Sequence, residues 1–158
     1  MSELFDRAFE IVVGFEGGYS NLSADPGGET KWGISSRQYP DEDIKNMTKD
    51  RAATLYYNDY WLPLQAFELP DDIAIMLFDM AVNMGRGNAV VCLQRAVGVK
   101  DDGLLGPVTR AALKAKYGPQ LLEEVTVERV MYYTSLETFP TFGLGWVRRS
   151  IRLLGQLI

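Results

Sequence analysis

Two carboxylic residues nine positions apart, Glu16 and Asp25, carry the strongest chemical signal in the sequence. Glu16 lies in the last turn of an apolar helical pattern, and Asp25 lies in a glycine-rich stretch. The negative end of a helix dipole and the apolar neighbour Phe15 both favour the protonated form of the Glu16 carboxyl group. A loop carboxylate such as Asp25 stays solvated and ionised. One protonated and one ionised carboxyl group form the pair that glycoside hydrolysis requires.

A hydroxyl group follows this pair, because Thr30 comes five residues after Asp25. Its oxygen could hold a water molecule or a sugar. Each of the three residues also has a purely structural interpretation, which stays open at this level. Glu16 could end a helix and face water, Asp25 could start an ordinary Asp-Pro turn, and Thr30 could simply favour a hairpin strand.

The elements that must position these residues are mostly helices. Apolar residues recur at helical spacing over residues 4–15, Ser2 can cap that helix, and two glycines end it. The following stretch, rich in Gly, Ser and Asn, predicts a loop or short hairpin. We therefore expect a mainly α fold with at most a small β-hairpin near residues 19–35. Further helices are predicted over residues 41–61, with Thr48 as an internal cap, and over 71–84, 88–97, 121–139 and 145–157, with another beginning at Pro107.

The amino-acid composition excludes several kinds of catalytic and metal site. The chain of 158 residues has no His and a single Cys, which excludes Ser-His-Asp and Cys-His catalysis, Cys/His zinc sites and internal disulfides. The lone Cys92 lies in a helical stripe and is expected to be a buried small hydrophobe. No metal and no organic cofactor is implied.

The chain shows neither a signal-peptide pattern nor a run of about 18 apolar residues. We therefore expect synthesis in the cytoplasm without a signal peptide, and no stable membrane insertion. Charge is uneven, with 6 basic and 15 acidic residues up to Met84, and 10 basic and 6 acidic residues from Gly85 onward. The acidic half argues against nucleic acid as a partner. The basic half could face an anionic polymer or form a solvated surface.

Three motifs together resemble a known family of enzymes. Residues 15–19 (FEGGY), 25–28 (DPGG) and 30–35 (TKWGIS) look like glycoside hydrolase family 108. That family comprises N-acetylmuramidases found mainly as phage and prophage endolysins, and the broader pattern resembles the phage-type lysozymes. The resemblance implies a lysozyme-like fold, with Glu16 as the catalytic acid. It also implies that Asp25 and Thr30 position or activate water.

Two further blocks, residues 56–61 and 77–85, also resemble the family. Within the second block, Asp79 and Asn83 are four residues apart and so share one helix face. They are candidates for substrate contact, and equally for a buried polar pair that ties helices together. Among the aromatic residues, Tyr19 and Trp32 are the ones we expect to offer flat faces to sugar rings.

The second half has its own signature. Residues 92–98 and the Asp-Gly-x-x-Gly-Pro-x-Thr stretch within 101–109 are similar to the helical peptidoglycan-binding modules that accompany the family. The alternative is that this half completes the core of the catalytic unit. We expect a lysozyme-like catalytic region over residues 1–84 and a helical peptidoglycan-binding-like region over 85–158, packed into one globule.

The leading hypothesis is a monomeric muramidase that cleaves the β-1,4 bond between N-acetylmuramic acid and N-acetylglucosamine. Its partners would be peptidoglycan glycan strands, together with a holin or other release system that gives access to the bacterial cell wall in the periplasm. Two alternatives stay open. One is a lytic transglycosylase that acts on the same bond through Glu16. The other is a non-catalytic peptidoglycan-binding accessory protein of a secretion system.

Overall fold

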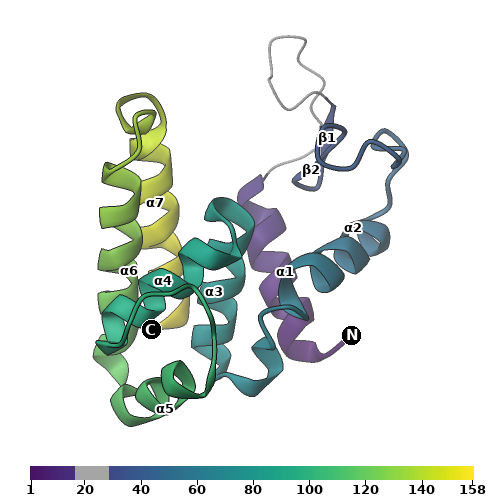
Figure 1. The fold of residues 1–158 in the computed structure, drawn as a ribbon. Coiled ribbons are helices and arrows are strands. Elements are labelled where there is room, and N and C mark those ends of the chain that lie inside the picture. The colour runs from purple at the N-terminus through teal and green to yellow at the C-terminus, as the bar shows by residue number, and fades with distance from the viewer. Residues whose placement is uncertain (17–28) are drawn as a thin grey trace. The chain divides into compact units, whose positions relative to one another are not determined.

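The computed structural model describes residues 1–16 and 29–158. It divides into two compact units, Met1–Leu62 and Pro63–Ile158. Within the described residues, seven α-helices and one two-stranded antiparallel sheet form (Figure 1). The prediction of a mainly α fold with at most a small hairpin near residues 19–35 is confirmed. The division into functional regions at residue 84, and their packing into one globule, stay predictions.

The first unit is built on helix α1 (Glu3–Glu16) and helix α2 (Lys49–Tyr56). The Ser2 hydroxyl accepts a hydrogen bond from the Phe5 amide at 3.2 Å, which confirms Ser2 as the cap of α1. An aromatic cluster fills the core between the helices. The ring of Phe5 lies 5.4 Å from that of Trp61, and the ring of Phe9 lies 5.6 Å from that of Tyr56.

A short hairpin joins β1 (Thr30–Lys31) to β2 (Ile34–Ser35). Thr30 pairs with Ser35 and Lys31 pairs with Ile34, so the turn consists of Trp32 and Gly33 alone. Both turn residues have positive φ angles, 55° and 77°. Such a turn matches the twist of the strands, and it usually carries Asn or Asp at its first position. Buried Ile34 anchors the hairpin to the first unit's core.

The prediction of a helix over residues 41–61 is wrong for residues 41–48. Residues 41–48 form turns instead, because the Asp43 carboxylate accepts hydrogen bonds from both the backbone and the side-chain nitrogens of Asn46. Thr48 is the true N-cap, with its hydroxyl accepting from the Arg51 amide at 3.1 Å. The helix then continues as a π-helical turn, η1 (Tyr57–Trp61).

The second unit surrounds helix α3 (Asp71–Met84), of which residues 73–81 are all buried. Helix α4 (Arg86–Val97) packs against α3 and against α6 (Pro119–Thr134), and α6 packs against α7 (Phe139–Leu157) (Figure 1). The remaining elements are the short helix η2 (Ala66–Glu68) and α5 (Pro107–Lys116). None of the helices over the described residues combines the length and the apolar character needed to cross a membrane.

The boundary between α6 and α7 differs from the sequence prediction. We predicted one helix to residue 139 and another from 145, whereas α6 ends at Thr134 and α7 begins at Phe139. The Ser135 hydroxyl donates to the Tyr132 carbonyl at 2.7 Å, a local bond that competes with continuation of the helix. Pro140 then lies in the first turn of α7, where its missing N–H group is tolerated.

Candidate functional site

The predicted general acid stands at the end of a helix. Glu16 is the last residue of α1, so the negative end of the helix dipole lies at its position. The first turn of α1 carries two acidic residues and its last turn carries no basic one, so no cation on the helix offsets that end. Asp25 and Tyr19, two of the other predicted site residues, lie outside the described residues.

Thr30 opens the hairpin that follows. It is partly buried and is paired with Ser35 across the two strands, which fixes its backbone in the first unit. The hairpin depends on buried Ile34 and on its two-residue turn for its position. Thr30 therefore sits on an ordered strand, a rigid support of the kind that a water-positioning hydroxyl needs.

Trp32 occupies the turn in a conformation that is uncommon for a large residue, with φ at 55°. The Tyr56 hydroxyl of α2 donates a hydrogen bond to the Trp32 carbonyl at 3.2 Å and so helps to hold this conformation. The indole nitrogen is buried and has no hydrogen-bond partner among the described residues. Backbone strain of this kind is characteristic of positions that the surrounding structure holds for a function.

A cation completes the surroundings of Trp32. The Lys49 ammonium group at the start of α2 lies 5.8 Å from the centre of the Trp32 ring. The same ammonium group forms an ion pair with Glu10 of α1 at 2.6 Å. Lys49 thus links the helix that bears Glu16 to the residue at the tip of the hairpin. Sequence reasoning missed Lys49, because nothing in its local pattern indicates contact with a residue 17 positions earlier.

Sequence reasoning also missed two tyrosines near the hairpin, Tyr39 and Tyr60. The Tyr39 hydroxyl donates to the Asp59 carboxylate at 2.6 Å, and the Gln38 amide donates to the Tyr60 hydroxyl at 2.6 Å. Burial raises the pKa of Tyr39 far above its usual range, and the bond to Asp59 raises it further. The Tyr39 phenol is therefore held as a proton donor to a carboxylate. The cluster of tyrosines in residues 56–60 is the sequence feature that could have indicated this network of phenol hydrogen bonds.

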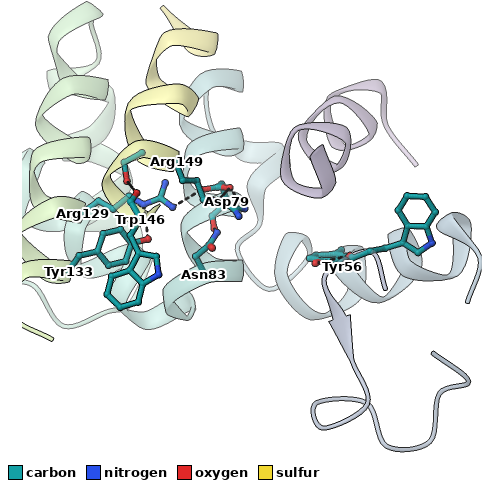
Figure 2. A network of polar contacts seen from close by, with 9 residues as sticks. Tyr56, Asp79, Asn83, Arg129, Tyr133, Trp146 and Arg149 are labelled. Carbon is teal, nitrogen blue, oxygen red and sulfur yellow. Dashed lines mark hydrogen bonds and ion pairs between the residues drawn. The ribbon is translucent and has the colours of Figure 1, made fainter. Parts of the chain in front are cut away.

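Asp79, in the second unit, is fully buried and ion-paired. Arg149 of α7 donates to its Oδ1 atom from two nitrogens, at 3.0 and 2.7 Å, and Arg129 of α6 lies 2.7 Å from its Oδ2 atom (Figure 2). The Asp79 side chain is 0% exposed and that of Arg129 is 2% exposed. This geometry is that of the helix-tying alternative which the sequence left open.

The same network extends to aromatic residues. Arg129 donates through Nε to the Tyr133 hydroxyl at 3.0 Å, and the rings of Tyr133 and Trp146 lie 5.1 Å apart (Figure 2). Burial raises the pKa of Tyr133, although the Arg129 guanidinium opposes the shift. The network joins α3, α6 and α7 and so holds the second unit together. Sequence reasoning missed both arginines as partners of Asp79.

Asn83 differs from Asp79 in its exposure. Its side-chain nitrogen donates to the Asp79 carbonyl at 2.6 Å, one turn earlier on α3. The residue is exposed, so its amide oxygen can reach other groups. The structure therefore brings Asp79 and Asn83 together and gives them different surroundings. Substrate contact by Asn83 stays a prediction.

The Asp-Gly-x-x-Gly-Pro-x-Thr stretch forms a turn that leads into α5, as its residue types predict, with Pro107 in the first helical turn. Buried Gln94 of α4 organises it. Its amide nitrogen donates to the Asp102 carboxylate at 2.8 Å and to the Thr109 hydroxyl at 3.0 Å. Its oxygen accepts from the Gly103 amide at 2.8 Å. The Asp, the first Gly and the Thr of this motif are thus joined through Gln94.

Metal binding finds no support in the part of the chain that the structure describes. Residues 1–16 and 29–158 contain no group of three or more acidic, Cys or His side chains close enough to hold a metal ion. Cys92 is buried, as predicted, and burial raises the pKa of its thiol to about 11.

Comparison with known proteins identifies both halves of the chain. The family model of glycosyl hydrolase 108 matches residues 9–85, and that of a predicted peptidoglycan domain matches residues 88–151. Among solved structures, the chain is similar to SagA of Brucella abortus, with 32% sequence identity and a TM-score of 0.85. The match covers 97% of this chain and 92% of that one. No curated protein sequence matches.

The chain therefore belongs to the glycosyl hydrolase 108 family. It is a glycoside hydrolase that acts on peptidoglycan, and it carries a peptidoglycan-binding domain next to its hydrolase region. The resemblance inferred from residues 15–35 is confirmed, as is the lysozyme-like fold. All seven predicted site residues lie within the range that the hydrolase model matches.

Proposed function

We propose that the chain is an N-acetylmuramidase that hydrolyses the β-1,4 bond between N-acetylmuramic acid and N-acetylglucosamine, with Glu16 as its general acid. The observation that carries this proposal is the place of Glu16 at the end of α1, inside the range matched by the hydrolase family. A carboxyl group at the negative end of a helix dipole favours its protonated form. A protonated carboxyl group is what the departing glycosidic oxygen needs.

In this mechanism Glu16 donates its proton to the glycosidic oxygen as the bond to the anomeric carbon breaks. Positive charge then develops on the sugar ring, and ionised Asp25 stabilises it or orients the attacking water. The Thr30 hydroxyl, held on β1, contributes to the placement of that water. The oxygen of the water bonds to the anomeric carbon, and the proton that this water loses passes to the now ionised carboxyl groups or to solvent, from which Glu16 is reprotonated. The product has a reducing N-acetylmuramic acid end.

Sugar rings would be bound by flat apolar faces near the hairpin. Trp32, strained in its turn and close to the Lys49 ammonium group, is the best supported of the predicted binding residues. Tyr19 and the exposed amide of Asn83 are further candidates. Asp79 is less suited to substrate contact, since its carboxylate is buried and already paired with two arginines.

The cell wall is the target that follows from the peptidoglycan-binding domain. We propose that the protein acts there as a monomer, in the manner of a phage or prophage endolysin. A holin or another release system would supply access to the periplasm.

Mass spectrometry of digested peptidoglycan tests the proposal. Products that end in reducing N-acetylmuramic acid would support hydrolysis of the proposed bond. Products lighter by one water would instead show the anhydro end made by a lytic transglycosylase. If the purified chain released no product, a non-catalytic binding role would replace the proposed function.

A further inference from the structure

The second unit contains a cavity of about 500 Å³, and no predicted site residue within the described part of the chain lines it. It is lined by residues of η2 and α5 and their flanking segments, and its walls include the aromatic Phe67 and Tyr117 and the apolar Leu113. Pockets that bind small ligands typically measure about 300–1,000 Å³. The cavity therefore has room for a few residues of peptide or a short sugar.

The two aromatic residues leave their rings available to a ligand. Phe67 is 60% exposed and Tyr117 is 49% exposed, which is unusual for side chains of this size. The Tyr117 hydroxyl donates to the Asp72 carboxylate at 3.1 Å, so the ring is held in place. These two residues form uncovered apolar walls rather than parts of the core.

Two cations line the same cavity. The Arg110 guanidinium is held by an ion pair with Glu68 at 3.1 Å and by a hydrogen bond to the Gln65 side chain at 2.6 Å. Gln65 has a φ angle of 48°, an uncommon conformation for a residue other than glycine. Lys114, one turn after Arg110 on α5, is exposed and has no ion pair or hydrogen bond within the described part of the chain.

The charges in the cavity favour an anionic ligand. Among the side chains that line the cavity, Arg110 and Lys114 carry positive charge and Glu68 carries negative charge, and Glu68 pairs with Arg110. The nearby Asp72 carboxylate is engaged by the Tyr117 hydroxyl, so Lys114 is the lining cation that can take an anionic group. The sugar rings of peptidoglycan are neutral, whereas its short peptide stems carry free carboxylates beside small aliphatic side chains. A carboxylate suits the Lys114 ammonium group, and the aliphatic groups suit Phe67 and Tyr117.

We propose that this cavity binds the acidic peptide stem of peptidoglycan, with Lys114 and Arg110 contacting a stem carboxylate and Phe67 packing against its aliphatic part. This inference rests on peptidoglycan being the substrate, as in the proposed function. It assigns recognition of the peptide to the second unit, and so separates it from cleavage of the glycan, which we place at Glu16.

Isothermal titration calorimetry on the full chain tests the assignment. A Glu16→Gln background removes turnover, and the probes are a synthetic stem tetrapeptide with free carboxylates, the same peptide with amidated carboxylates, and the peptide-free disaccharide. The acidic tetrapeptide is expected to bind about tenfold more tightly than the amidated one, because a charged hydrogen bond is lost. Equal affinity for these two peptides, or no binding of either, would overturn the assignment.

Substitutions locate the binding at the cavity. Lys114→Gln and Phe67→Ala are each expected to weaken tetrapeptide binding by about tenfold. Lys100→Gln is the matched control, because Lys100 is an exposed lysine of the same unit that does not line this cavity. Equal affinities for K114Q and K100Q would contradict the proposal, whatever their thermal stability.

The proposed function and this inference can fail separately. A parent chain that releases glycan fragments but does not bind the tetrapeptide would overturn the inference and leave the muramidase intact. A chain that binds the tetrapeptide through Lys114 but cleaves no glycan would support the inference and overturn the proposed function.

Discussion

Asp79 of α3 and Arg129 of α6 form an ion pair at 2.7 Å in which both side chains are almost completely buried. Arg149 of α7 approaches the other carboxylate oxygen at 2.7 Å. One carboxylate therefore binds two guanidinium groups, and three helices meet around it. Removal of the carboxylate would take from the buried Arg129 guanidinium its negative partner, which is far more costly than loss of an exposed pair.

We predict that Asp79→Asn lowers the free energy of unfolding by about 3–5 kcal/mol. Guanidinium chloride denaturation of the full chain measures this change. The matched control is Asp101→Asn, because Asp101 pairs with Arg95 at 2.8 Å on the surface of the same unit. The control should lose no more than about 1 kcal/mol. Similar losses for the two variants would contradict a structural role for the Asp79 network.

Alkaline pH should destabilise the second unit through Cys92. Burial, with a smaller contribution from Glu128, raises the pKa of this thiol from 9.0 to about 11 in the folded state, while Arg95 and Arg129 oppose the shift. A raised folded-state pKa means that the stabilising contribution is complete below pH 9 and is lost as the pH rises through 11. The expected loss is about 2–3 kcal/mol.

Urea denaturation at a series of pH values measures the effect of Cys92. The variant Cys92→Ala removes the titrating group, so its free energy of unfolding should fall less steeply above pH 9 than that of the parent chain. The raised pKa of Tyr133 also lowers the free energy of unfolding at alkaline pH, and it does so in both proteins. The difference between the two curves therefore isolates the effect of the thiol. Parallel curves for the two proteins would refute the prediction.

Local chemistry explains which parts of the fold the sequence predicts. The caps at Ser2 and Thr48 and the turn before Pro107 depend on neighbours within a few residues, and all three form. The start of α2 was misplaced because the side chain of Asp43 competes with the helix for backbone bonds. The spacing of hydrophobic residues does not reveal that competition.

Long-range contacts explain what the sequence does not predict about the site. The motif around Glu16 identifies the family from consecutive residues, so it can be recognised directly. Asp79 and Arg149 are 70 residues apart, and no local pattern indicates that they meet. The contact of Lys49 with Trp32 and the cavity beside Phe67 likewise depend on packing between separate elements.

The strained Trp32 gives a prediction that separates binding from folding. Asn tolerates positive φ, so Trp32→Asn should keep the hairpin turn while it removes the aromatic face. We expect KM for peptidoglycan fragments to rise by about threefold to tenfold, as loss of one aromatic contact implies. Circular dichroism checks that the helices persist.

The control for Trp32 is Tyr56→Phe. This variant keeps the aromatic core but removes the hydroxyl that donates to the Trp32 carbonyl, and it should cost about 1 kcal/mol of stability. Its effect on KM should be smaller than that of Trp32→Asn. If both variants left KM unchanged, Trp32 would serve the hairpin alone.

The general acid is the central claim, and turbidity clearing of outer-membrane-permeabilised Gram-negative cells tests it most directly. The parent chain, Glu16→Gln and Glu3→Gln are compared at a temperature at which thermal unfolding curves show all three to be folded. Glu3 is the exposed first residue of the same helix, so its variant repeats the chemical change at the opposite end from Glu16. Glu16→Gln should reduce the clearing rate by about 10²–10⁴-fold, with Glu3→Gln close to the parent. Equal clearing by Glu16→Gln and the parent would contradict the assignment of Glu16 as the acid.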